Sequence, residues 1–287
     1  MAVDSLPTDP PTKVRTQVQY YHDIFRPRCA GMLLALPLLW LATGSPLAAE
    51  NWPRFRGAAG AGISDEAGFP KTWSPGEYAW QIGLPGEGHA APIIWDDKLF
   101  VTSALDEGAL RLLFCLDAKT GEELWSQAAG LNRSHKHLKG SWASSTPCTD
   151  GTRVFVAFAD QEHHTLAAYD FDGGLVWRRV LGAFESQHGQ GVSPIVYDGM
   201  VILPNDQDGP SSVMAFDAST GRTVWSAVRT SRRTSYATPL ILDLPGSAPQ
   251  LICSCGALGV TSLDPQTGRV NWESGELLAR TVGSTVL

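Results

Sequence analysis

Short hydrophobic runs separated by polar turns recur along the chain from about residue 90 onward. Four of them hold the same place in successive units: Lys98–Thr102, Arg153–Ala157, Met200–Leu203 and Gln250–Cys253. Runs of this length, rich in β-branched and aromatic residues, are typical of strands, whereas amphipathic helices place apolar residues three and four positions apart. The pattern therefore predicts an all-β chain and excludes helical repeats.

One longer phrase, Asp-x-x-Thr-Gly-x-x-x-Trp, gives these units a regular period. It occurs as Asp117–Trp125, Asp217–Trp225 and Asp264–Trp272, and a copy one residue shorter occurs as Asp170–Trp177. Consecutive Trp residues of the four copies are 52, 48 and 47 residues apart. Self-similarity at a period of this length is the signature of a repeat architecture.

The residue types of the phrase predict a hairpin tip followed by a strand. Glycine supplies the positive φ of a tight turn, and Asp and Thr side chains can bond to the turn backbone. The Trp then falls on the last strand of the unit, where we expect its indole to cover the neighbouring unit. The alternative is an ordinary core Trp within its own unit, since aromatic residues favour strands in general.

A second phrase opens each unit, and together the phrases define four strands per repeat. The openings are Ala90–Ile93, Ser145–Cys148, Val192–Ile195 and Ala237–Leu240. Four-stranded units of this period stack radially into a β-propeller of antiparallel blades. The predicted blades span approximately 89–127, 144–181, 192–229 and 236–275.

Both ends of the repeat region carry partial units. Tyr78–Ile82 resembles a fourth strand with no blade before it, and Ser284–Leu287 resembles another opening, so residues 281–287 are predicted to start a further blade. Four blades, a closing strand and the start of a fifth lead us to expect a chain truncated from a seven- or eight-bladed ring.

The N-terminal 49 residues have the layout of a leader and secretory signal peptide. The apolar run Met32–Ala42 follows Arg26 and Arg28, and small residues up to Ala49 supply a cleavage site. The run is shorter than the roughly 20 residues of a membrane-spanning helix. We therefore expect export to the periplasm or cell envelope with no stable membrane span after cleavage; a retained anchor is the alternative.

The charge of the chain bears on its partners, and its cysteines bear on its covalent structure. The net charge of −7 over the whole chain, without a basic stripe, makes nucleic acid an improbable partner, because an acidic protein repels phosphate groups. Four cysteines follow the leader: Cys115, Cys148, Cys253 and Cys255. We interpret them as small buried hydrophobic residues, although an exported chain also permits disulfides.

The repeated phrases resemble the pyrroloquinoline-quinone-like propeller repeats shared by bacterial quinoprotein alcohol dehydrogenases and the propeller-type outer-membrane protein assembly factor. Asn51–Gly57 and Ser141–Pro147 are similar to a group of exported quinone-binding-like propellers. The resemblance covers residues 51–287. In its enzymatic branch it implies a quinone with Ca²⁺ over the channel and a disulfide between adjacent cysteines, whereas here Ser254 separates Cys253 from Cys255.

Two polar clusters remain as candidate sites. His89, His137 and His188 precede first strands, where imidazoles gathered at the channel mouth would bind a transition metal or titrate near neutral pH; solvated loop histidines are the simpler hypothesis. Asp206 and Asp208 faintly resemble a calcium loop but lack the downstream Glu, which favours a plain turn. The sequence therefore assigns no catalytic, cofactor-binding or metal residue.

Two functions are compatible with these features. The first is a non-catalytic binding or scaffolding propeller whose face takes a protein or a polymer ligand, with no cofactor. The alternative is an alcohol dehydrogenase dependent on pyrroloquinoline quinone and calcium, which rests on the shared fold alone. The sequence favours the first and leaves enzymatic activity open.

Overall fold

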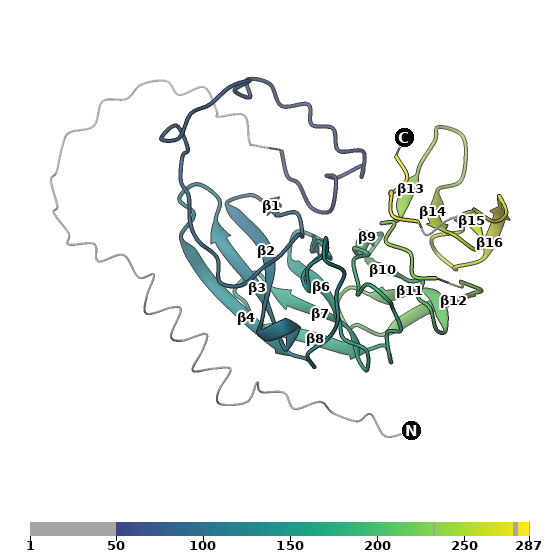
Figure 1. Cartoon of the computed structure of the whole chain (residues 1–287). Helices are drawn as coiled ribbons and strands as arrows, with labels where there is room; N and C mark the ends of the chain where they lie inside the picture. The colour runs from purple at the N-terminus through teal and green to yellow at the C-terminus, as the bar shows by residue number, and fades with distance from the viewer. Residues whose placement is uncertain (1–49, 232, 278–280, 287) are drawn as a thin grey trace, which may run out of the picture.

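The computed structural model describes residues 50–231, 233–277 and 281–286, which form four sheets of four antiparallel strands. The sheets stand side by side in an arc, here called blades 1 to 4 in chain order (Figure 1). This confirms the predicted β-propeller class. The predicted leader and signal peptide, residues 1–49, lie outside the described residues, as does Leu287.

Each blade is built from consecutive strands, so its innermost strand comes first and its outermost strand last. A single short 3-10 helix among the described residues, η1 (Asp106–Gly108), lies between the second and third strands of blade 1. The strands are β1 (Ile93–Trp95), β2 (Lys98–Leu105), β3 (Leu110–Asp117), β4 (Glu123–Gly130), β5 (Cys148–Thr149), β6 (Arg153–Ala159), β7 (His164–Asp170), β8 (Leu175–Val180), β9 (Ile195–Tyr197), β10 (Met200–Asn205), β11 (Ser211–Asp217), β12 (Thr223–Arg229), β13 (Leu240–Leu242), β14 (Gln250–Cys255), β15 (Gly259–Leu263) and β16 (Val270–Glu273).

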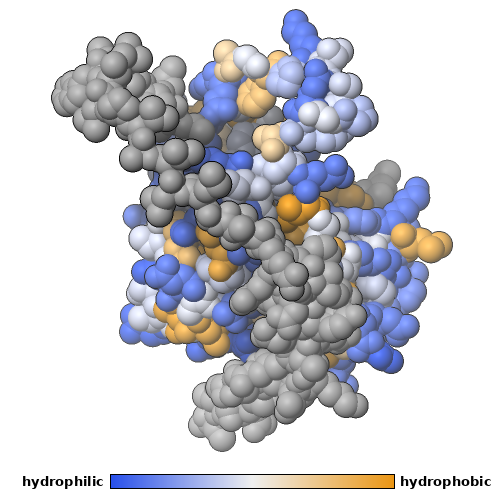
Figure 2. Space-filling view, turned by 90° about the vertical axis from the view of Figure 1, so that its left-hand side faces the viewer, coloured by the Kyte–Doolittle hydropathy of each residue, from blue (hydrophilic) through white to orange (hydrophobic). Residues whose placement is uncertain are grey.

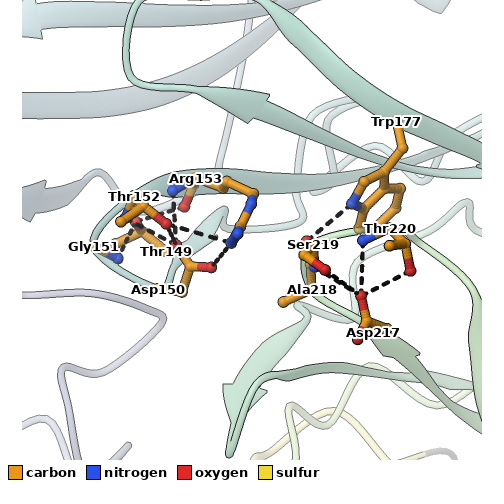
Figure 3. A network of polar contacts seen from close by, with 10 residues as sticks. All are labelled: Thr149, Asp150, Gly151, Thr152, Arg153, Trp177, Asp217, Ala218, Ser219 and Thr220. Atoms are coloured by element: carbon orange, nitrogen blue, oxygen red, sulfur yellow. Dashed lines mark hydrogen bonds and ion pairs between the residues drawn. The ribbon is translucent and has the colours of Figure 1, made fainter.

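The Asp-x-x-Thr-Gly phrase forms the turn between the third and fourth strands, as predicted. In blade 3 the Oδ1 atom of Asp217 accepts hydrogen bonds from the backbone and hydroxyl groups of Ser219 and Thr220 (Figure 3). Gly221 then takes a φ of 68°, which the absence of a Cβ permits. These bonds lower the pKa of the Asp217 carboxyl to about 2, because they favour its charged form.

A bulge follows each turn, and in blades 1 to 3 it directs the Trp at the next blade. The strand register shifts so that the residue before each Trp has no partner on the third strand. In blade 1, Trp125 pairs with Cys115 while Leu124 is left out and half exposed. The bulge therefore turns the indole inward and the preceding side chain outward.

The Trp residues of blades 1 to 3 lie between blades, which confirms the prediction over its alternative. Trp177 lies over Gly221 of blade 3 and donates from Nε1 to Ala218 O at 2.9 Å (Figure 3). Trp125 and Trp225 make the same bond to Phe171 O and Pro265 O in the following blades. Each glycine of the turn is thus needed twice, for its φ and for the space that the indole fills.

Three hydrophobic clusters occupy the seams between successive blades and hold the arc together. The cluster between blades 2 and 3 combines Phe155, Leu166 and Trp177 with Val201 and Phe216, all of them buried. Equivalent clusters join blades 1 and 2 and blades 3 and 4. On the side of the molecule seen in Figure 2, hydrophilic residues predominate and apolar ones form small separate patches. The three seam clusters therefore bury apolar side chains between successive blades, as radial stacking requires.

The segment Tyr78–Ile82 forms no strand, in contrast to the prediction. Residues 78–82 have no ladder partner among the described residues, and a strand needs one to satisfy its backbone N–H and C=O groups. Trp80 nevertheless takes the position of an interblade Trp. Its indole lies over Gly121, and Nε1 donates to Ala118 O at 3.0 Å. Side-chain docking therefore persists here without strand pairing.

The predicted start of a further blade is described up to Val286. Within it, Ser284 Oγ accepts a hydrogen bond from the backbone N–H of Thr238 at 3.0 Å. Thr146 Oγ1 accepts the equivalent bond from Ala91 N, and Ser193 Oγ accepts one from Thr146 N. The hydroxyl residue of one blade opening thus caps the opening before it, and Ser284 makes the same bond to blade 4.

Candidate binding face

Two sets of loops lie on the same face of the arc and form what we call the loop face. They are the connections between blades (residues 131–147, 181–194 and, of the third connection, 230–231 and 233–239) and the loops between second and third strands (106–109, 160–163 and 206–210). Backbone hydrogen bonds join the sets, for example Ser134 N to Glu107 O at 3.2 Å and Phe184 N to Gln161 O at 3.2 Å. These hydrogen bonds between the two sets hold the loops in one conformation.

Carboxylate side chains hold these loops in place by accepting hydrogen bonds, chiefly from the loop backbone. Asp160 accepts from the backbone N–H groups of Asn132, Glu162 and His163, and its carboxylate also lies 3.2 Å from His163 Nδ1. Burial alone would raise the pKa of Asp160, but these hydrogen bonds together outweigh it, so the pKa lies below its usual value. Asp160 thereby fixes the loop that leaves blade 1 onto blade 2.

Asp206 and Asp208 are two further anchors of these loops. Asp206 is buried and lies 2.8 Å from Arg229 Nε, and Asp208 accepts from Thr234 N at 2.7 Å and from Gln187 N at 3.1 Å. Protein donors thus engage both carboxylates. Arg229, at the end of an outer strand, carried no sequence signal for this role.

The structure brings together two of the three candidate histidines. The rings of His137 and His188 are 4.8 Å apart in an edge-to-face contact, and His137 N donates to His188 O at 3.3 Å. His89 is held separately, through its backbone N–H to Ser141 Oγ at 2.9 Å. Among the described residues, no group of three or more His, Cys, Asp or Glu side chains is placed to hold a metal ion.

Buried polar side chains cross the seams beneath the loop face. Arg111 donates to Ala159 O across the first seam, His164 Nδ1 lies 2.9 Å from Asn205 Oδ1 across the second, and Arg229 donates to Cys255 Sγ across the third. Burial lowers the pKa of His164 to about 4 and that of Arg111 to about 10. The arrangement makes His164 neutral at physiological pH.

A small hollow, partly open to solvent and with room for about one water molecule, lies among the loops of this face. Its lining mixes small, polar and aromatic groups: Ser134, His135, Ala159, Asp160, Gln161, Phe184, Ser186, Gly189 and Gln190. Leu138, in the loop that also supplies Ser134 and His135, is 94% exposed. The face therefore offers a firm, uneven polar surface with an exposed apolar side chain.

The cysteines of the described residues do not match the pair that the resemblance implies for the enzymatic branch. Cys115, Cys148, Cys253 and Cys255 are all buried free thiols, as interpreted from the sequence. Cys253 packs in the core between blades 3 and 4, and Cys255 accepts from Arg229. Neither can supply the disulfide of adjacent cysteines that the resemblance implies.

Comparison with known proteins identifies the family to which the chain belongs. The model of a family described as outer membrane protein assembly factor BamB matches residues 111–285. The chain belongs to this family. The match begins within β3 and runs through blade 4, so it takes in all four copies of the repeated phrase.

Solved structures of the BamB family and of quinoproteins are similar to the chain. BamB from Moraxella catarrhalis is 22% identical, with a TM-score of 0.48 over 68% of this chain and 54% of that protein. Quinohemoprotein alcohol dehydrogenase from Comamonas testosteroni is 17% identical, with a TM-score of 0.49 over 67% of this chain and 35% of that enzyme.

Among curated proteins, the tetrathionate hydrolase of Acidithiobacillus ferrooxidans is 26% identical over 178 residues. The aligned region covers 59% of this chain and 32% of the hydrolase. The chain thus spans about a third of that relative and about half of the Moraxella BamB. Among the described residues, no helix has the length and apolar character needed to cross a membrane.

Proposed function

We propose that the chain is an exported, non-catalytic member of the BamB family that binds a protein or polymer ligand through its loop face. The observation that carries the proposal is the interlocking of the loops over buried anchors such as Asp160 and Asp206. A surface held in one conformation loses little conformational entropy when a partner binds. The family's description as an assembly factor supports a protein as the partner.

Site-specific photo-cross-linking in the envelope of the producing cell tests the proposal. A photoreactive phenylalanine analogue replaces Leu138 on the loop face or, as the matched control, Val228 on the outer strand β12. Both side chains are apolar and strongly exposed, at 94% and 86%. We expect an adduct with a defined envelope protein or glycan polymer at position 138 only, and equal labelling at both positions, or none, would contradict a binding loop face.

Two further measurements address export and catalysis. Mass spectrometry of the protein from the envelope should show an N-terminus at Glu50, since cleavage is predicted after Ala49. Titration with pyrroloquinoline quinone and Ca²⁺ should leave the cofactor spectrum unchanged. Stoichiometric quinone binding with reduction of a dye by an alcohol would replace the proposal with the dehydrogenase alternative.

A further inference from the structure

The segment Asn51–Gly57, which precedes the blades in sequence, lies at the axis of the arc between blades far apart in the chain. Figure 1 shows this purple segment between β1 and β13. The innermost strands β1, β5 and β13 each stand at the end of a sheet, so one edge of each lacks a neighbouring strand. Unpaired strand edges are natural receptors for extended backbone.

Residues 51–54 form hydrogen bonds with β1, with β5 and with the residue just before β13. Trp52 and Ile94 of β1 exchange backbone hydrogen bonds at 2.8 and 3.0 Å, which is an antiparallel bridge. Pro53 O accepts from Thr149 N of β5 at 2.9 Å, and a proline suits this position because only its carbonyl is used. Arg54 Nη2 donates to Pro239 O, just before β13, at 2.8 Å.

We propose that the axis of the arc is a seat for an extended peptide and that residues 51–54 fill it as an intramolecular plug. The seat is distinct from the loop face. It recognises main chain on two sides, through β1 and β5, and an arginine side chain at the third, through Pro239 O.

Two glycines shape the plug. Gly57 and Gly60 have φ values of 75° and 70° and turn the chain back on itself. A Cβ on Gly57 would lie 2.8 Å from the Trp52 ring, and one on Gly60 would lie 2.7 Å from Arg54 Nη2. The turn therefore holds the indole and the guanidinium in the orientation in which they meet the blades.

Arg54 is the side chain that closes the seat. It is 7% exposed, and burial lowers its pKa to about 10, so the group stays charged at neutral pH. Cys148, at the start of β5, is a fully buried thiol; burial raises the pKa of this thiol, and the nearby Arg54 charge opposes that rise only in part. Cys148 is thus a natural reporter of whether the plug is seated.

Thiol modification of the full chain, with the labelled cysteine identified by mass spectrometry, tests the plug. Arg54→Ala removes the hydrogen bond from a charged donor to Pro239 O, which is among the stronger kinds in proteins, so the plug should open more often. We expect modification of Cys148 to become roughly tenfold or more faster relative to Cys115 in the same molecules, even though loss of the Arg54 charge by itself raises the pKa of the Cys148 thiol. Arg56→Ala is the matched control. That side chain lies over the Phe55 ring, and its removal should leave the rate unchanged.

A rescue measurement tests the seat itself. A free peptide with the sequence of residues 51–57 is added to the Trp52→Ala/Arg54→Ala variant and should slow the modification of Cys148 again. The same peptide with alanine in place of its first arginine should not. An unchanged Cys148 rate in Arg54→Ala, a parallel rise at Cys115, Cys253 and Cys255, or no protection by the peptide would each overturn the proposal.

Discussion

Replacement of Trp177 with alanine tests the idea that indoles between blades hold the arc together. Trp177 is 9% exposed, packs against Phe155 with ring centres 5.9 Å apart, and donates to Ala218 O. Truncation of a buried aromatic side chain to alanine costs about 3–5 kcal/mol, because apolar contacts are lost and a cavity is left. We expect the upper part of that range, since Ala218 O also loses its donor.

Trp272→Ala is the matched control at the same repeat position in blade 4. Its indole is 44% exposed and donates to Gln250 Oε1 of its own blade, so its removal should cost about 1 kcal/mol. Urea unfolding followed by far-UV circular dichroism measures both variants. Hydrogen exchange of blades 2 and 3 locates the weakened seam, because stacked repeats can unfold in steps. Equal destabilisation by the two substitutions would refute the reasoning.

Three further predictions concern the turns and the buried polar groups. Gly199 and Gly221 both have positive φ, but only at Gly221 would an added Cβ meet an indole, at 2.6 Å from the Trp177 ring. Gly199→Ala should therefore lower the free energy of unfolding by about 1 kcal/mol, and Gly221→Ala should lower it clearly more, as measured by urea unfolding. Burial lowers the pKa of His164 to about 4 in the folded protein, against 6.5 for an ordinary histidine. The free energy of unfolding should therefore fall as the pH drops from 6.5 toward 4. In His164→Gln, the profile of Tm against pH should be flatter over that range. Asp206→Asn leaves the buried Arg229 without its carboxylate and should cost about 3–5 kcal/mol, against less than about 1 kcal/mol for Asp208→Asn at an exposed position, as measured by thermal unfolding.

The sequence by itself determined the blade. The turn of Asp217–Gly221 and the bulge before Trp225 depend on residues within a few positions of one another, so the local sequence is enough to predict the turn and the position of the Trp after it. Repetition then implied that each Trp faces the next unit. The same logic misplaced Tyr78–Ile82, because a strand also needs a partner strand, and only Trp80 found its docking position.

Only the tertiary structure decided the roles of groups that meet across blades. Arg54 reaches Pro239, 185 residues away, and His164 meets Asn205, 41 residues away, through contacts without a periodic signature. The polar side chains that cross the three seams, Arg111, His164 and Arg229, differ in type from one blade to the next, so no repeated phrase marks them. Likewise, three histidines precede first strands, but the course of the loops brought only His137 and His188 together. Local turn chemistry repeats with the chain, whereas contacts across the arc arise only once the blades have stacked.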